Sequence, residues 1–292
     1  TTGLQLSGRE RTFIAAVAPR GIVAAAVASI TDRLRLGHLV LGNTYRSPAL
    51  VAKMAGTVDH VSHGRFTLGI GAAWFTREHE AFGWEFPSMK ERSDRLEEAC
   101  ALIRAQFTSE SPVDFDGRYY RLDAASLSPG SAQKPHIPIL VGGMGERRTL
   151  RTLAKYGDVF NLDGFAAKGY GGMSLEWYLR KVEVLNRHCE AVGRDPAEIS
   201  HTVLIPTMVS DDISEADKFI AAIGPGTIAG TAEYVIARVG ELGVGHVESQ
   251  FAGFGHIILA VDELEPRLGI DEAAYQPCGR NPIDMDVAAR HP

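Results

Sequence analysis

A glycine-rich segment at residues 142–145, Gly-Gly-Met-Gly, follows a predicted strand and precedes helical sequence directly. Free backbone N–H groups and the positive end of a helix favour a bound anion such as phosphate at this position. Arg147 and Arg148 add positive charge close by. Because glycines also serve ordinary strand-to-helix turns, a phosphate site and a plain turn are both interpretations of this segment.

Small or polar residues also follow two earlier predicted strands. Gly69, Gly71 and the two alanines after it would let a flat ligand lie against the backbone. Tight packing of a helix on the strand explains the same residues equally well. Asn43, Thr44 and Arg46 follow the strand predicted at 33–40 and would face a ligand, unless the segment is an ordinary capped loop.

Candidates for proton transfer and substrate contact are few. Trp74, Glu78 and His79 share one predicted loop, and Asn161 lies near the end of a further strand. An imidazole titrates near neutral pH, so His79 is a weak candidate for moving protons. A surface histidine is the commoner explanation of such a residue. The adjacent Glu97–Glu98 pair is most simply a solvated helix face.

Several other chemistries are disfavoured. The ten histidines form no His-x-His or His-Glu-x-x-His pair, and the three cysteines, Cys100, Cys189 and Cys278, form no Cys-x-x-Cys, so we expect no metal site. No Gly-x-Ser-x-Gly segment marks a hydrolase nucleophile. No phosphate-loop motif occurs, and Gly69-Ile-Gly71 continues Ala-Ala-Trp, which is not the dinucleotide fingerprint.

The composition is that of a globular protein, with 45% hydrophobic and 23% charged residues among 292. A net charge of -6 argues against nucleic acid as the main partner. No apolar run approaches the roughly 18 residues that a membrane span needs. With no visible signal peptide and an odd, scattered set of cysteines, we expect a cytoplasmic protein.

The elements that must position these residues alternate along the chain. Strands are predicted near residues 34, 66, 138, 158, 201 and 246, each followed by helical sequence. Strict alternation implies a parallel sheet, either open and doubly wound or closed into an eight-stranded barrel. Residues 113–122 alternate around Asp116–Gly117, which predicts a hairpin within an insertion at 111–136. The tail at 270–292 has few structural signals.

An ordered series of motifs resembles the bacterial-luciferase-like flavin and deazaflavin oxidoreductases. The series includes Gly-Asn-Thr-Tyr-Arg at 42–46, Gly-Arg-x-x-Leu-Gly-Ile-Gly-Ala-x-Trp at 64–74, Glu-His at 78–79 and Pro-Ile-Leu-Val-Gly-Gly at 138–143. It covers about residues 21 to 270. The Gly-Asn-Thr-Tyr-Arg variant is most similar to the branch predicted to use coenzyme F420.

The resemblance implies a single-domain (β/α)8 TIM barrel over residues 1–292, with a cofactor ring at the strand ends. A non-proline cis peptide, by position Leu39–Val40, would form a bulge behind the ring. The family's ring contacts map to Gly42, Asn43, Gly71, Ala72 and Ala73, and its phosphate site maps to Gly142, Gly143, Met144 and Gly145. Trp74, Glu78, His79 and Asn161 would then shape the substrate side.

The sequence departs from the family pattern at its front. Residues 1–20 contain neither a clear pair of strands nor the family's Asp-His pair, so the first strands of the barrel are expected to be incomplete and no catalytic histidine is carried over. The resemblance implies hydride transfer between coenzyme F420 and a small organic substrate. The alternatives are an FMN-dependent luciferase-like monooxygenase and, in another class, a truncated, inactive barrel. A homodimer is expected from the family.

Overall fold

The computed structural model describes residues 20–32, 35–163, 175–224, 227–241, 246–248 and 255–261. In these residues the core is a nine-stranded sheet in the order β1-β3-β6-β7-β8-β11-β10, with β2 paired to β3 and β9 paired to β8. The predicted tail at 270–292 lies outside the described residues.

Most strands of this sheet are parallel, as predicted from the alternation of strands and helices. The parallel strands are β1 (Leu36–Gly37), β2 (Leu41–Gly42), β3 (Phe66–Gly71), β6 (Ile139–Gly142), β7 (Val159–Asp163), β8 (Ser200–Val209) and β9 (Ile228–Gly230). Strands β3 and β6 consist almost entirely of buried residues. Such nearly continuous buried runs are typical of parallel strands that are covered on both faces.

The last two strands correct the predicted topology. Strand β10 (His246–Glu248) lies at the predicted position, but it runs antiparallel to β11 (Gly255–Val261), which itself runs antiparallel to β8. A parallel return needs a crossover of about a dozen residues or more, whereas an antiparallel return needs only a short turn. Only six residues separate β10 from β11, too few for a crossover, which agrees with the antiparallel pairing of the two strands.

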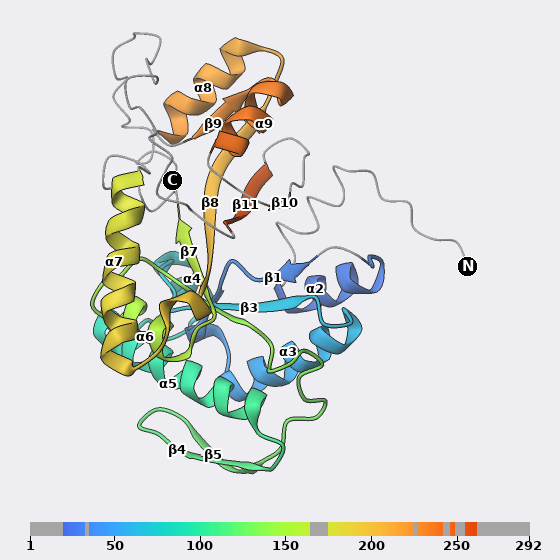
Figure 1. Ribbon diagram of the computed structural model, residues 1–292. Coiled ribbons are helices and arrows are strands. Elements are labelled where there is room, and N and C mark those ends of the chain that lie inside the picture. Colours follow the sequence, from blue (N-terminus) through green and yellow to red (C-terminus); the bar gives the residue numbers. More distant parts are fainter. Residues whose placement is uncertain are drawn as a thin grey trace.

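Helices follow the strands along the chain. They are α2 (Arg20–Ser29), α3 (Pro48–Val61), α4 (Thr76–Phe82), α5 (Met89–Thr108), α6 (Thr149–Tyr156), α7 (Leu175–Val192), α8 (Ile213–Ile223) and α9 (Ala232–Glu241). Helices α2, α3, α5, α6 and α7 pack side by side in chain order (Figure 1). This arrangement is one wall of the predicted barrel. The described strands do not close, because the sheet ends at β1 and β10.

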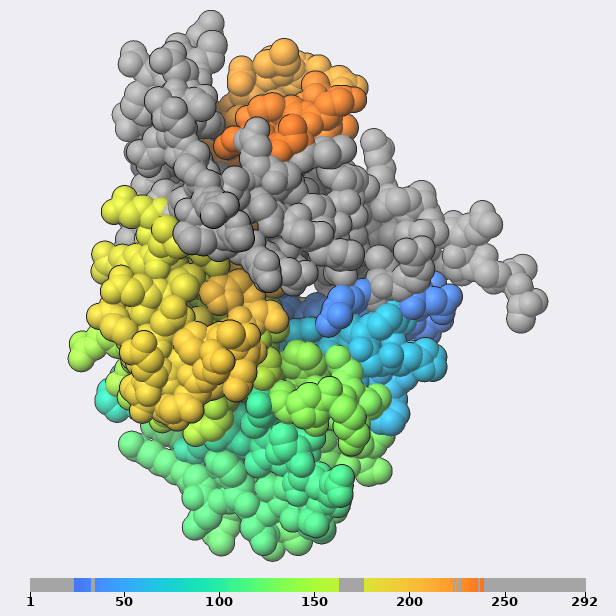
Figure 2. All heavy atoms as spheres, viewed as in Figure 1, coloured from blue at the N-terminus to red at the C-terminus, as the bar shows by residue number. Residues whose placement is uncertain are grey.

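The predicted hairpin is present as a separate two-stranded sheet of β4 (Val113–Asp116) and β5 (Arg121–Ala125). Figure 2 shows the α5 and hairpin segments, in green, together at the lower end of the molecule. The Glu98 carboxylate on α5 accepts hydrogen bonds from the backbone N–H groups of Arg118, Tyr119 and Tyr120, at 3.1, 2.7 and 2.7 Å. Interpreting Glu98 as part of a solvated helix face was therefore wrong.

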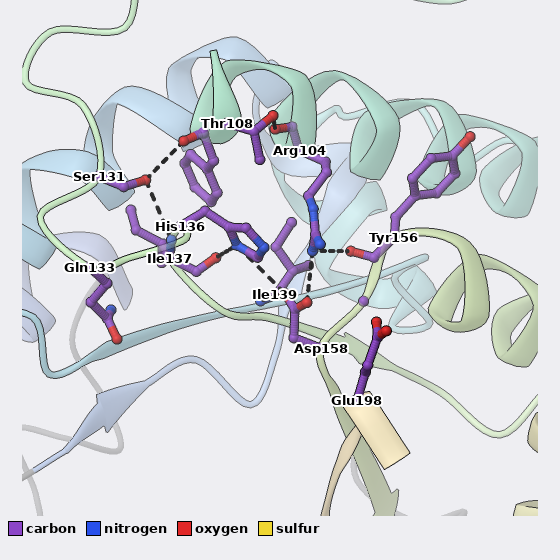
Figure 3. A network of polar contacts seen from close by, with 12 residues as sticks. Arg104, Thr108, Ser131, Gln133, His136, Ile137, Ile139, Tyr156, Asp158 and Glu198 are labelled. Carbon is purple, nitrogen blue, oxygen red and sulfur yellow. Dashed lines mark hydrogen bonds and ion pairs between the residues drawn. The ribbon is translucent and has the colours of Figure 1, made fainter. Parts of the chain in front are cut away.

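A polar network fastens the sheet to its helices at the amino ends of β6 and β7 (Figure 3). The Asp158 carboxylate accepts hydrogen bonds from Arg104 of α5 at 2.7 Å and from the backbone N–H of Ile139 at 2.8 Å. Arg194, just beyond α7, lies 3.5 Å from the same carboxylate. In parallel α/β folds, this end of the strands serves stability.

Candidate functional site

The predicted cis peptide at Leu39–Val40 is confirmed, and it lies between β1 and β2. The Val40 side chain projects over glycines at the ends of two neighbouring strands. A Cβ added to Gly71 would lie 2.9 Å from a Val40 methyl carbon, and one added to Gly142 would lie 2.7 Å from both. The packing of Val40 therefore requires these glycines, and their contact with a cofactor ring stays a prediction.

Asn43 follows this bulge and is buried, with 4% of its surface exposed. Its Nδ2 donates a hydrogen bond to the Tyr120 hydroxyl at 2.9 Å, and its Oδ1 is buried with no partner in the described part of the chain. Burial raises the pKa of Tyr120, which keeps its hydroxyl protonated. An unpaired buried amide oxygen costs free energy unless a ligand or water reaches it. The hairpin insertion thus supplies Tyr120 to the site, which the sequence did not reveal.

A buried arginine holds the backbone after β3. The Arg92 guanidinium donates to the carbonyl oxygens of Ala72 and Ala73, and it lies 3.9 Å from the centre of the Phe86 ring. Ala73 has a φ of 63°, an uncommon conformation for a residue with a side chain. Burial lowers the pKa of Arg92. Arg92 was not predicted as a site residue, although it lies one turn before Leu96 on the buried stripe of α5.

His79 is completely buried, with 0% of its surface exposed, so its interpretation as a surface residue was wrong. It lies on helix α4, not in a loop. Its Nδ1 is 2.8 Å from the carbonyl oxygen of Phe75, and its Nε2 is 2.7 Å from the Thr44 hydroxyl. Because a carbonyl only accepts, Nδ1 carries the proton of the neutral ring and Nε2 accepts from Thr44. His79 therefore fixes Thr44 and presents neither nitrogen to a ligand.

Glu78 and Trp74 are placed differently from His79. The Tyr45 hydroxyl donates a hydrogen bond to Glu78 Oε2 at 2.6 Å, while Trp74 is 80% exposed. The Tyr45 ring also covers Gly42, where an added Cβ would lie 2.6 Å from a ring carbon. A surface hollow of about 470 Å³ is lined by Phe75, Arg77, Glu78, Ala81 and Phe82. Trp74, Glu78 and the residues that line this hollow all belong to the segment that follows β3.

Asn161 lies within β7 and is buried. Its Nδ2 donates to the Thr202 hydroxyl on β8 at 2.8 Å, and Thr202 in turn donates to the Phe160 carbonyl oxygen at 3.1 Å. Within the described residues, no hydrogen bond joins the Asn161 side chain to the residues on or beside α4. The structure therefore brings Asn43, Thr44, Glu78 and His79 together and leaves Asn161 in a separate polar pair.

The sequence predicted that the glycine-rich segment 142–145 lies directly before a helix. In the structure, a turn at 146–148 separates this segment from α6. The carbonyl oxygen of Gly145 accepts from the Leu150 N–H at 3.1 Å. In the described part of the chain, the backbone N–H groups of Met144, Gly145, Glu146 and Arg147 donate to no other group. These four donors remain available to an anion.

Helix α7 holds this segment from outside. The Lys181 ammonium donates to Glu146 Oε1 at 2.8 Å and to the Met144 carbonyl oxygen at 3.3 Å. The His188 Nε2 is 2.7 Å from the Glu146 carbonyl oxygen. The hydrogen bond from Lys181 lowers the pKa of Glu146 and so favours its charged form. The four N–H groups are thus carried by a segment that is tied down at both Met144 and Glu146.

These features fit an elongated cofactor with a ring at one end and an anionic group further along. The free end of the Asn43 amide offers a hydrogen bond to a polar ring edge, and the four N–H groups offer hydrogen bonds to a phosphate. Among the described residues, no three or more histidine, cysteine or acidic side chains gather closely enough to hold a metal ion. No helix in the described ranges is long and apolar enough to cross a membrane.

Comparison with curated proteins finds relatives that include F420-dependent dehydrogenases. The chain is 34% identical over 195 residues to an F420-dependent glucose-6-phosphate dehydrogenase of Kineococcus radiotolerans, which covers 65% of this chain and 53% of the relative. It is 33% identical over 193 residues to the enzyme of the same name from Amycolatopsis mediterranei, covering 65% and 55%. The chain thus spans about half the length of the curated relatives it matches.

Solved structures share the fold. An F420-dependent secondary alcohol dehydrogenase in complex with an F420-acetone adduct superposes with a TM-score of 0.63 at 21% identity, covering 76% of this chain and 74% of that one. The monooxygenase RslO1 from Streptomyces bottropensis gives 0.61 at 22% identity, covering 76% and 71%. The family model for luciferase-like monooxygenases matches residues 21–264. The chain therefore belongs to the luciferase-like monooxygenase family.

Proposed function

We propose that this chain binds coenzyme F420 along the carboxyl ends of β2, β3 and β6 and serves hydride transfer between that cofactor and a small organic substrate. One observation carries the proposal: groups that could contact a ligand follow one another across neighbouring strand ends. They are the Val40 bulge, the unpaired Asn43 amide oxygen and the four free N–H groups of residues 144–147. The curated relatives named as F420-dependent dehydrogenases support the choice of cofactor.

Each part of the series has a role in this proposal. The bulge at Leu39–Val40 lies behind the ring, while Gly42, Asn43 and residues 71–73 line its edge. Residues 142–145 and their neighbours bind the phosphate through backbone N–H groups. When bound, the deazaflavin ring supplies the hydride chemistry, and the protein supplies position and electrostatics.

The substrate side is assigned to the segment after β3. Trp74 is exposed and offers a flat apolar surface, and Glu78, four residues further along the chain, is a polar group that is already oriented by Tyr45. His79 acts through Thr44, because both of its nitrogens are occupied. In this proposal His79 is a positioning residue, and Glu78 is the titratable group closest to a bound substrate.

The rest of the chain completes the proposal. Residues 1–292 form one barrel domain, with 111–136 as an insertion and 270–292 as a tail, which acts as a homodimer in the cytoplasm. Cys100 and Cys189 are free and buried thiols, in keeping with a reducing compartment. Burial raises the pKa of Cys100 to about 12, which makes this thiol inert. Light scattering in solution tests the dimer.

A second candidate function is an FMN-dependent monooxygenase, which the description of the matched family and the fold of RslO1 favour. A titration separates the two candidates. We expect the chain to bind coenzyme F420 with a saturable change in cofactor fluorescence, and Asn43→Ala to weaken that binding about tenfold through the lost hydrogen bonds. Tight FMN binding without F420 binding contradicts the proposal.

The titration needs a matched control because asparagine-to-alanine changes also alter folding. Asn186 lies on the outer helix α7 and makes no side-chain hydrogen bond in the described part of the chain, so Asn186→Ala should bind F420 like the wild type. Cooperative unfolding of the wild-type chain without binding of either cofactor would favour the inactive-barrel alternative.

A further inference from the structure

We propose that a basic hollow beside residues 144–147 binds the carboxylates that coenzyme F420 carries beyond its phosphate; the proposal rests on the proposed function. The hollow measures about 370 Å³ and is lined by Asp94, Arg147, Arg148 and Arg151. The lining thus contains three guanidinium groups and one carboxylate. It therefore presents a net positive surface next to the predicted phosphate site.

The position of the hollow follows from its elements. Arg147 and Arg148 lie in the turn between Gly145 and α6, Arg151 lies in the first turn of α6, and Asp94 lies in the first turns of α5. Both helices begin after the carboxyl ends of their strands. The hollow is therefore at the same end of the sheet as the cofactor site, between two outer helices, where a chain leaving the phosphate would emerge.

The three arginines are not equally engaged. Arg148 hydrogen-bonds to Asp94, and Arg151 donates to Glu97 at 2.6 Å. Arg147 is exposed and forms no ion pair within the described residues. Each guanidinium has five N–H donors, so the two paired arginines also keep donors for a ligand. Arg147 is then the residue whose charge a ligand would neutralise most directly.

The chemistry of the hollow favours carboxylates on a flexible chain. A planar guanidinium matches a carboxylate with two parallel hydrogen bonds. Coenzyme F420 continues from its phosphate into a lactyl group and glutamate units with free carboxylates, whereas FMN ends at its phosphate. A substrate that reacts at the ring would lie at the other end of the cofactor. The hollow therefore fits the glutamate tail and distinguishes F420 from FMN.

The test compares the Kd of F420 that bears its glutamate tail with the Kd of the form that ends at the lactyl group. For the wild-type chain at low salt, we expect the tailed form to bind about tenfold tighter, since exposed ion pairs each contribute up to about a fivefold factor. Arg147→Gln should reduce this ratio to about twofold. Salt at about 1 M should do the same, because it screens exposed charges.

A matched control and distinct outcomes make the test decisive. Arg187 on α7 is similarly exposed, so Arg187→Gln should keep the wild-type ratio. Equal affinity for the two forms would refute the tail site and leave the proposed function standing. An equal loss of affinity for both forms in Arg147→Gln would assign Arg147 to the phosphate and refute the tail site. Binding of neither form would overturn both proposals.

Discussion

At the scale of single residues, the site depends on approaches so close that they exclude a Cβ. Val40 fills the space above Gly71 and Gly142, and Tyr45 fills the space above Gly42. The sequence offered two interpretations of these small residues, a flat ligand or tight packing. In the structure, the packing partner of Gly71 and Gly142 is the Val40 side chain, which projects from the bulge beside the neighbouring strand.

Replacing Gly142 tests this packing. Gly142→Ala places a methyl group 2.7 Å from both methyl carbons of Val40, so the bulge must shift. Overpacking of this kind costs about 1–3 kcal/mol, measured as the free energy of unfolding in urea. The control is Gly130→Ala, where the nearest atom to the added methyl lies 3.9 Å away and little change is expected. Equal stability of the two variants would show that Val40 does not need this glycine.

The Thr44 hydroxyl is the second residue-scale test. In Thr44→Val, the Nε2 of His79 loses its only hydrogen-bond donor in the described structure while it stays buried. An unsatisfied buried group costs about 1–3 kcal/mol in the free energy of unfolding. Thr44→Ser keeps the hydroxyl and should lie close to the wild type. If both variants unfold alike, the hydrogen bond contributes nothing to stability.

Burial of single side chains was the hardest feature to predict. His79 is enclosed by the rings of Tyr45, Trp84 and Phe86, with ring centres at 4.8, 6.2 and 4.6 Å. Those rings come from two separate segments, so no local pattern around His79 indicated its burial. The Leu39–Val40 peptide and the 142–145 segment, by contrast, were predicted because the family resemblance fixes them by position.

At the scale of elements, the strands and long helices were predicted well because their apolar periodicity is strong. Helix α4 was missed: it has only seven residues, and its clearest signal is Gly83, which ends it in a left-handed conformation with a φ of 66°. The strand predicted at 33–40 is present only as β1, and β2 was missed because the bulge at Leu39–Val40 separates these two short strands. Strands β9 and β11 were missed because β9 is very short and β11 follows β10 without a helix.

The Asp158 network tests the link between the sheet and its helices. Asp158→Asn removes the charge that Arg104 and Arg194 face, and these side chains are 30% and 13% exposed. We expect a loss of about 1–3 kcal/mol in the free energy of unfolding, less than for a fully buried pair because solvent screens part of the interaction. The Kd for F420 should stay unchanged, since the network lies at the opposite end of the strands. A weakened Kd would contradict this separation.

The contact between α7 and β8 predicts a pH dependence. The Tyr178 hydroxyl lies 2.6 Å from His201 Nδ1, and burial lowers the pKa of His201 below its ordinary 6.5. A lowered pKa means stability that is present above pH 6.5 and is lost as the pH falls through the pKa of the folded protein. The free energy of unfolding should fall by up to about 1.4 kcal/mol per pH unit in this range. His201→Gln should remove this contribution; an unchanged slope would refute it.

At the scale of the whole molecule, the two ends of the parallel strands have different roles. The amino ends carry Asp158 and its partners, which hold helices to the sheet. The carboxyl ends carry the Val40 bulge, Asn43 and the free N–H groups of residues 144–147. This division was predictable from the alternation of strands and helices. The antiparallel return of β11 was not, because it depends on how few residues join it to β10.

The most direct test of the proposed site is a crystal structure of this chain with coenzyme F420 bound. We predict that the ring lies against the Leu39–Val40 bulge, that the Asn43 amide oxygen accepts a hydrogen bond from it, and that the phosphate accepts hydrogen bonds from the N–H groups of residues 144–147. A cofactor bound away from the bulge, or a phosphate that does not contact residues 144–147, would contradict the account.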